Sequence, residues 1–288
     1  MAENEDPAVT RFREYIRINT MQPNPDYEKC TAWLKARGEA VGGEVRVVES
    51  APGKPVVLIT FKGTDPRLPS LLLNSHTDVV PVFPEHWKYD PFSATKDENG
   101  DIYGRGTQDM KCVGAQYLEA INRMRKQGKT FLRTIHLSFV PEEEIGGVLG
   151  MKEFVKMPEF EELNVGFALD EGYANPSEKF SLFYAERTVW LQFNVVPAEL
   201  SVGFDIRIPP TVDLTEFVGK IAAWCKEAGD DVTFEFKQKL KIPALGFSPM
   251  NHTPILLHDH NEFLNEKIFL RGIDIYCTII SALANKPE

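Results

Sequence analysis

Three apolar segments of this chain change abruptly into polar or acidic residues, and this repeated pattern limits the available folds more than any other feature. SLLLNSHTDVV begins at residue 70, TIHLSFVPEEE at residue 134 and VGFALDEG at residue 165. Continuous apolar runs are typical of strands buried on both faces of a parallel sheet. Helical patterns separate these runs. The sequence therefore predicts an α/β fold, with a mostly parallel sheet flanked by helices.

The residues around these runs predict helices and further strands. A helix is expected after the Asp6-Pro7 pair, and a second one over 27–40. EVRVVES and PVVLITFKG predict two strands that pair with each other. MKCVGAQYLEAINRMRKQG predicts a helix that ends at Gly128. Residues 81–108 are expected to form a long loop, and loops of that length are usually functional.

The pattern changes after about residue 187. TVWLQF, LSVGFDIRI and VTFEFKQ alternate apolar and polar residues, and a helix is expected over about 213–228. This alternation is typical of an antiparallel sheet with one solvated face. We therefore expect a main domain formed by 1–187 and 241–288, interrupted by a smaller, incomplete α+β subdomain over 188–240. A last helix is expected to end near Leu283.

Composition limits the classes of function. The formal net charge is -10, and no cluster of Lys and Arg provides the basic face that nucleic-acid binding needs. No stretch approaches the roughly 20 apolar residues of a membrane helix, and no secretory signal pattern is present. The four cysteines are widely scattered, so free buried thiols are expected. These features favour a cytoplasmic protein that binds neither nucleic acid nor membrane.

Potential metal ligands and proton-transfer groups lie at the predicted strand ends and in loops. They are His76, Asp78, Asp109, Glu143, Glu144, Glu171 and His258. Each short pattern alone is more often structural, as a hydrogen-bonded pair, a helix start or a turn. Their joint occurrence is informative, because ligand sites in such sheets lie beyond the carboxyl ends of the strands. Mixed imidazole and carboxylate ligands suit zinc or a similar divalent ion.

Two local arrangements suggest a division of roles. On a strand, residues i and i+2 point to the same side, so His76 can bind a metal while Asp78 fixes its ring from behind. The adjacent Glu143 and Glu144 can divide two tasks. One would bind metal, and the other would accept a proton from an attacking water.

Five motifs occur in a fixed order, namely NSHTDVVP, GRGTQDMK, VPEEEIGG, FALDEG and LLHDHNE, with flanking segments such as IPALGFSPMN and FLRGIDIY. In this order and context the chain resembles the aminoacylase / carboxypeptidase-G-like family of co-catalytic zinc hydrolases, along nearly its whole length. The resemblance implies two zinc ions per chain and zinc-assisted attack of water on an amide. It also implies an N-acyl-L-amino acid as substrate, a free amino acid and a carboxylic acid as products, and a homodimer.

The resemblance also assigns roles within the site. It implies that His76 and Glu171 bind one zinc ion and that Glu144 and His258 bind the other. It implies that Asp109 binds both. Glu143 resembles the general base and acid, and Asp78 the carboxylate behind His76. The spacing His-x-x-Asn-Glu selects His258 as the ligand over His260, which is expected to be structural.

Two elements of the family pattern are absent. A Gly-His-Ala-type motif, whose His helps to stabilise the oxyanion across a dimer interface, is missing near Phe193-Asn194. An Asp-x-Arg element, whose Arg binds the substrate carboxylate, is missing near Leu240-Lys241. Two alternatives to an active acylase therefore remain open. One is a zinc-binding variant with impaired or no turnover, and the other is a related dipeptidase.

Overall fold

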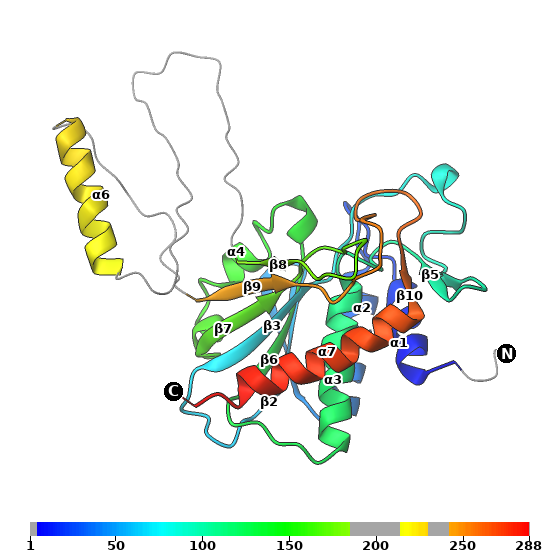
Figure 1. The fold of residues 1–288 in the computed structure, drawn as a ribbon, viewed down its shortest axis with the longest axis horizontal. Coiled ribbons are helices and arrows are strands. Elements are labelled where there is room, and N and C mark those ends of the chain that lie inside the picture. The colour runs from blue at the N-terminus through cyan, green and yellow to red at the C-terminus, as the bar shows by residue number, and fades with distance from the viewer. Residues whose placement is uncertain (1–4, 185–213, 230–241, 288) are drawn as a thin grey trace. The chain divides into compact units, whose positions relative to one another are not determined.

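The structure, a computed structural model, describes residues 5–184, 214–229 and 242–287 (Figure 1). Contacts divide the chain into two compact units, Met1–Phe183 with Ala244–Glu288, and Tyr184–Pro243. The domain boundaries predicted after residues 187 and 240 lie outside the described residues. The strands predicted from TVWLQF, LSVGFDIRI and VTFEFKQ lie outside them as well.

The first unit is built on a mixed sheet with a parallel centre. Its strands, in spatial order, are β1 (Glu44–Ala51), β2 (Lys54–Phe61), β6 (Ile135–Val140), β3 (Ser70–His76), β7 (Val165–Asp170), β9 (Ala244–Phe247) and β8 (Leu182–Phe183). The neighbours β6, β3, β7 and β9 run parallel, whereas β1, β2 and β8 pair antiparallel at the two sides. Every residue of β3 and β6 is buried, as their apolar sequences predicted.

The segment predicted as one long loop over 81–108 contains regular structure. It holds a short 3-10 helix, η1 (Pro84–His86), and two short strands, β4 (Thr95–Lys96) and β5 (Asp101–Tyr103). These strands form a second sheet with β10 (Phe263–Asn265), in the order β10-β5-β4. The prediction missed this sheet because its strands are too short to show a periodic pattern.

Helices begin and end close to the predicted positions. The helices are α1 (Pro7–Ile16), α2 (Tyr27–Val41), α3 (Lys111–Lys126), α4 (Met151–Phe154), α5 (Pro158–Glu161), α6 (Leu214–Ala228) and α7 (Glu266–Ala284). The Asp6 side chain caps α1 by accepting a hydrogen bond from the amide of Ala8 (2.8 Å). Gly42 ends α2 in the left-handed region, at φ 81°. Of these helices, α6 alone belongs to the second unit.

Helices α2, α3 and α7 pack together against the main sheet (Figure 1). The position of α3 matters most for the site, because this helix begins two residues after Asp109. Gly114 allows α3 to approach β3 closely, since a Cβ atom there would lie 2.7 Å from Ser75 Oγ and 2.8 Å from Phe139 Cε1. The sequence thereby brings the start of α3 next to the end of β3, where His76 lies.

Two further predictions concern the state of the cysteines and the presence of a membrane helix. All four cysteines are free, as predicted. Only Cys30 and Cys112 are buried, however, so the expectation of four buried thiols is wrong for the half-buried Cys225 and Cys277. Among the helices that the structure describes, none has both the length and the hydropathy required to cross a bilayer.

His136 on β6 is expected to make the fold less stable in acid. The residue is 7% exposed, and its Nδ1 lies 2.8 Å from Thr60 Oγ1 on β2. Burial lowers its pKa to about 4, from an ordinary value of 6.5. Between these two values the unfolded chain binds a proton that the folded chain does not. The free energy of unfolding should therefore fall by roughly 3 kcal/mol as the pH drops through this window.

The variant His136→Gln keeps a partner for Thr60 and removes the titration. Urea unfolding at pH 7 and pH 4.5 should show a smaller loss of stability for this variant than for the unchanged chain. His86→Gln, which alters an exposed histidine of η1, is the control and should behave like the unchanged chain. Equal losses in His136→Gln and the unchanged chain would contradict the assignment.

Candidate metal centre

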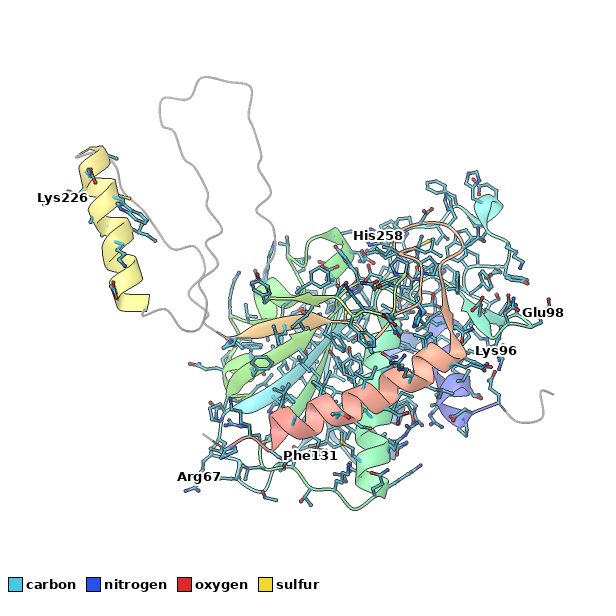
Figure 2. All side chains as sticks on the ribbon, viewed as in Figure 1. Arg67, Lys96, Glu98, Phe131, Lys226 and His258 are labelled. Atoms are coloured by element: carbon cyan, nitrogen blue, oxygen red, sulfur yellow. The ribbon has the colours of Figure 1, made fainter. Side chains whose placement is uncertain are left out.

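The polar ends of three parallel strands meet at one edge of the main sheet. His76 is the last residue of β3, and Glu171 follows the last residue of β7. After β6 the chain forms the short 3-10 helix η2 (Glu143–Ile145). The loop between β9 and β10 adds His258, which lies at the opposite end of this unit from Arg67 and Phe131 (Figure 2). The topology therefore brings these four distant sequence segments to one place.

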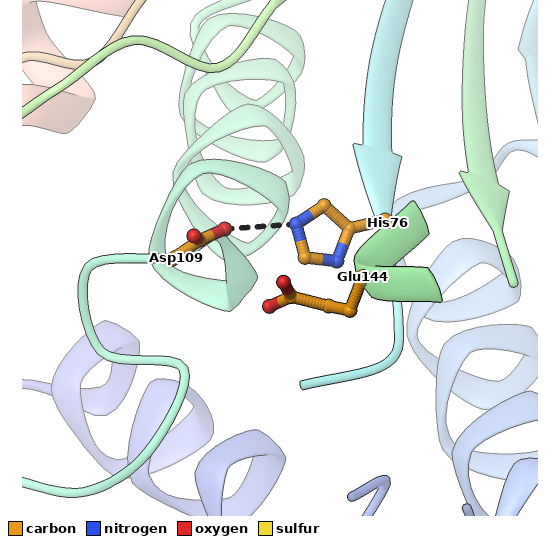
Figure 3. A group of neighbouring side chains, drawn as sticks. All are labelled: His76, Asp109 and Glu144. Atoms are coloured by element: carbon orange, nitrogen blue, oxygen red, sulfur yellow. Dashed lines mark hydrogen bonds and ion pairs between the residues drawn. The ribbon is translucent and has the colours of Figure 1, made fainter. Parts of the chain in front are cut away.

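Asp109 lies between two histidine rings. Its Oδ1 is 2.9 Å from His76 Nε2, and its Oδ2 is 3.1 Å from His258 Nε2. Figure 3 shows the first of these contacts, with Glu144 directed toward the same space. The position of Asp109 follows from its place immediately before Met110, the N-cap of α3. One carboxylate is thus shared by two imidazoles, which is the arrangement that a bridging ligand requires.

The remaining carboxylates surround these two rings. Glu144 Oε2 lies 3.0 Å from His258 Nε2, and Glu171 Oε1 lies 3.6 Å from His76 Nε2. Glu143 Oε2 is 4.0 Å from His76 Nε2. The ligand atoms of two groups, His76–Asp109–Glu144 and His76–Glu143–Glu171, each lie within 4.8 Å of one another. The structure therefore brings together all five residues that the sequence suggested as ligands, and the suggested base.

Asp78 contacts His76 in a different way from the one expected. The Nδ1 of His76 is 2.9 Å from the backbone oxygen of Asp78 and 3.7 Å from its carboxylate. The fully buried carboxylate accepts hydrogen bonds from the amides of Glu143 (3.0 Å) and Glu144 (3.3 Å). It also accepts one from Gln22 Nε2 (2.8 Å), a residue that the sequence patterns did not single out. Asp78 thus orients the histidine through its backbone and the two glutamates through its side chain.

His260, the neighbouring histidine, packs against other aromatic rings. Its ring centroid lies 4.9 Å from that of His86 and 6.4 Å from that of Phe83. His258, by contrast, has half of its side chain exposed and its Nε2 beside the carboxylates of Asp109 and Glu144. The two histidines therefore differ in their surroundings, and only the His258 ring lies beside the carboxylates of the cluster.

The electrostatics of this cluster favour the binding of cations. Burial, reinforced by the Asp109 carboxylate, raises the pKa of Glu144 to about 7, and burial also raises the pKa of Glu171 and of Glu143. Although burial acts to lower it, the nearby Glu171 and Asp109 carboxylates hold the pKa of His76 well above its ordinary value. So many acidic groups in one buried place are costly unless cations neutralise them.

The donor atoms suit divalent ions. Nδ1 of His76 donates its proton to the backbone oxygen of Asp78, so Nε2 is the ring nitrogen that can bind an ion, in place of the proton that it shares with Asp109. The buried Oε1 of Glu144 has no hydrogen-bond partner among the described residues, although buried carboxylate oxygens are normally satisfied. Imidazole and carboxylate ligands of this kind could hold zinc or a similar ion.

Comparison with known proteins agrees with this arrangement. Residues 72–282 match the profile of the Peptidase family M20/M25/M40. Aminoacylase-1 of Mus musculus is 41% identical over 396 aligned residues, which cover 99% of this chain and 97% of that protein. Aminoacylase-1 of Homo sapiens is 40% identical, with the same coverage of both chains.

The fold has counterparts among solved structures. An M20 family metallo-carboxypeptidase, Sso-CP2 from Sulfolobus solfataricus, matches with a TM-score of 0.55 and 24% sequence identity. The match covers 62% of this chain and 40% of that chain. It supports an α/β fold for this chain.

This chain is shorter than the relatives that it matches end to end. The alignment with the mouse protein spans 396 positions, whereas this chain has 288 residues. At least 108 aligned positions, the difference between 396 and 288, therefore hold no residue of this chain. The gaps predicted near Phe193-Asn194 and Leu240-Lys241 fall outside the described residues, and their location stays a prediction. The matched profile and the identity along almost the whole chain show that the protein belongs to the peptidase family M20/M25/M40, a family of metal-dependent hydrolases.

Proposed function

We propose that this protein is a zinc-dependent amidohydrolase that converts N-acyl-L-amino acids into a free amino acid and a carboxylic acid. The observation that carries the proposal is the position of Asp109, with one oxygen near His76 and the other near His258. A carboxylate placed in this way can bridge two ions, and such pairs promote hydrolysis. The substrate class is supported by the names of the relatives, which are aminoacylases.

The proposed ligands divide into two overlapping sets. Asp109 belongs to both, His76 and Glu171 belong to the first, and Glu144 and His258 belong to the second. A zinc pair held by these residues would polarise the amide carbonyl and make water more acidic. The chain's own residues supply the geometry, because their positions are fixed by strand ends and by the start of α3.

Glu143 is proposed as the group that moves the proton. Half of its side chain is exposed at the site, while its backbone amide is held by the Asp78 carboxylate. It can therefore accept a proton from the attacking water and deliver it to the departing amide nitrogen. Asp78 is proposed to position Glu143 and Glu144 for these two separate tasks.

The proposal also covers the domain organisation, the location in the cell and the oligomeric state. Residues 1–187 and 241–288 would form the catalytic domain, and 188–240 a shortened lid subdomain. We further propose a cytoplasmic location, which the four free cysteines support. The chain is shorter than its alignment with the mouse protein, and this favours a second candidate function, that of a chain that binds zinc without turnover. If the lid is incomplete, the homodimer that the family resemblance implies would be weakened.

One experiment separates these functions. The purified full chain is analysed for bound zinc and solution mass, and it is then incubated with N-acetyl-L-methionine and with a neutral dipeptide. We expect close to two zinc ions per chain and release of methionine that a chelator abolishes. Two zinc ions without hydrolysis would favour the non-catalytic candidate, and faster cleavage of the dipeptide would favour a dipeptidase. A chain that binds no divalent ion would refute the whole proposal.

A further inference from the structure

The segment that carries Asp109 and the segment that carries His258 are joined by a second set of contacts behind the candidate metal centre. Gln108, the residue before Asp109, is 2% exposed. Its Nε2 donates hydrogen bonds to the backbone oxygens of Pro254 (3.0 Å) and Phe263 (2.9 Å), and its Oε1 accepts one from the amide of Leu256 (3.0 Å). One side chain thereby holds both ends of the loop on which His258 lies.

Glu262 makes the reciprocal contacts, from the His258 segment back to the Asp109 segment. Its Oε1 accepts hydrogen bonds from the amides of Gln108 (2.6 Å) and Asp109 (3.3 Å). Its Oε2 accepts one from the amide of Gly106 (3.3 Å) and pairs with the Arg105 guanidinium (2.6 Å). The Glu262 side chain is fully buried, so these contacts are protected from water.

Arg105 completes the connection. Its Nη2 donates a hydrogen bond to the backbone oxygen of Asp259 (3.0 Å), and its guanidinium lies 5.3 Å from the centre of the Trp87 ring. His258, between Leu256 and Asp259, has a φ of 62°. A non-glycine residue keeps this left-handed conformation only where its surroundings impose it. Gln108 on one side and Arg105 on the other supply that constraint.

We infer that Gln108 and Glu262 are positioning residues that fix the distance between Asp109 and His258 before any ion binds. This inference rests on the proposed function, because it concerns two of the proposed ligands. Neither residue contacts the ligand atoms of the cluster through its side chain. They act through the backbone of the two segments, and holding the ligands ready lowers the ordering cost of ion binding.

Gln108→Met tests this inference without leaving a buried charge. Glu262→Gln is less suitable as the main variant, because it leaves the buried Arg105 guanidinium unpaired, which is strongly destabilising. In a competition titration of the full chain with zinc and a chromophoric chelator, Gln108→Met should weaken binding of one of the two ions by about 10- to 100-fold. The ion assigned to His258 is expected to be the weaker one, because the variant releases the His258 loop.

A second readout requires no ion. In the chelated chain, hydrogen exchange of the peptide containing residues 254–263 should become at least tenfold faster in Gln108→Met. Glu119→Gln is the control, because it weakens a largely buried polar contact away from the His258 loop, the ion pair between Arg11 and Glu119 on α3. This control should lower the Tm but leave both zinc affinity and exchange of 254–263 unchanged.

The outcomes distinguish a failure of the positioning role from a failure of the proposed function. If the unchanged chain binds zinc and Gln108→Met binds both ions equally well with unchanged exchange, the positioning role is refuted and the proposed function stands. If the unchanged chain binds no divalent ion, the proposed function fails. The exchange rates of 254–263 then still decide whether Gln108 holds the His258 loop.

Discussion

Glu143→Gln is expected to lower the rate of N-acyl-amino-acid hydrolysis by about 10²- to 10⁴-fold, the usual contribution of a general base. The amide of glutamine cannot accept the proton of the attacking water, although it has nearly the same shape. Zinc content should stay close to that of the unchanged chain, because the proposed ligands remain in place. The backbone amide of residue 143 would still donate its hydrogen bond to the Asp78 carboxylate, so the backbone of η2 should not move.

The adjacent Glu142 provides a matched control. Its carboxylate is buried, pairs with Lys54 and accepts a hydrogen bond from the amide of Leu149. Glu142→Gln should therefore lower the Tm and leave kcat within a few-fold of the unchanged value. Loss of zinc from Glu143→Gln would show that Glu143 is a ligand. Full activity in that variant would show that another group moves the proton.

The sequence predicted those parts of the fold that depend on long patterns. The apolar runs of β3 and β6 predicted buried central strands, and Asp6 and Gly42 marked the ends of helices. The second sheet was missed because β4, β5 and β10 have only two or three residues each. Their pairing is decided by contacts between distant segments, and local periodicity carries no information about such contacts.

The candidate site shows the same division. His76 and Glu171 could be placed together because parallel strands end at a common edge. Gln22, Gln108 and Glu262 could not be assigned a role in the same way, since their importance lies in hydrogen bonds to backbone groups far away in the sequence. Polar residues of this kind look like ordinary loop residues until the fold brings their partners close.

Asp109→Asn is expected to weaken the binding of both zinc ions by at least about 100-fold. Loss of a group that merely supports a ligand already costs roughly 10- to 100-fold in metal affinity, and Asp109 is proposed as a direct ligand of both ions. An asparagine offers one neutral oxygen in place of two charged ones. It therefore cannot serve the His76 side and the His258 side of the site together. Competition titration with a chelator measures the loss.

Thermal unfolding gives an independent measure, because an ion that binds only the folded chain raises its Tm. Zinc should stabilise the unchanged chain and leave Asp109→Asn almost unaffected. Without zinc the variant should be less stable than the unchanged chain, because it loses the contacts with two histidines that, against the effect of burial, keep the pKa of the Asp109 carboxyl below its ordinary value. Asp259→Asn is the control, because the exposed Asp259 carboxylate accepts a hydrogen bond from the backbone amide of His260 (2.7 Å). Zinc should stabilise this control variant as much as it stabilises the unchanged chain. A zinc-dependent rise in the Tm of Asp109→Asn equal to that of the control would exclude Asp109 as the shared ligand.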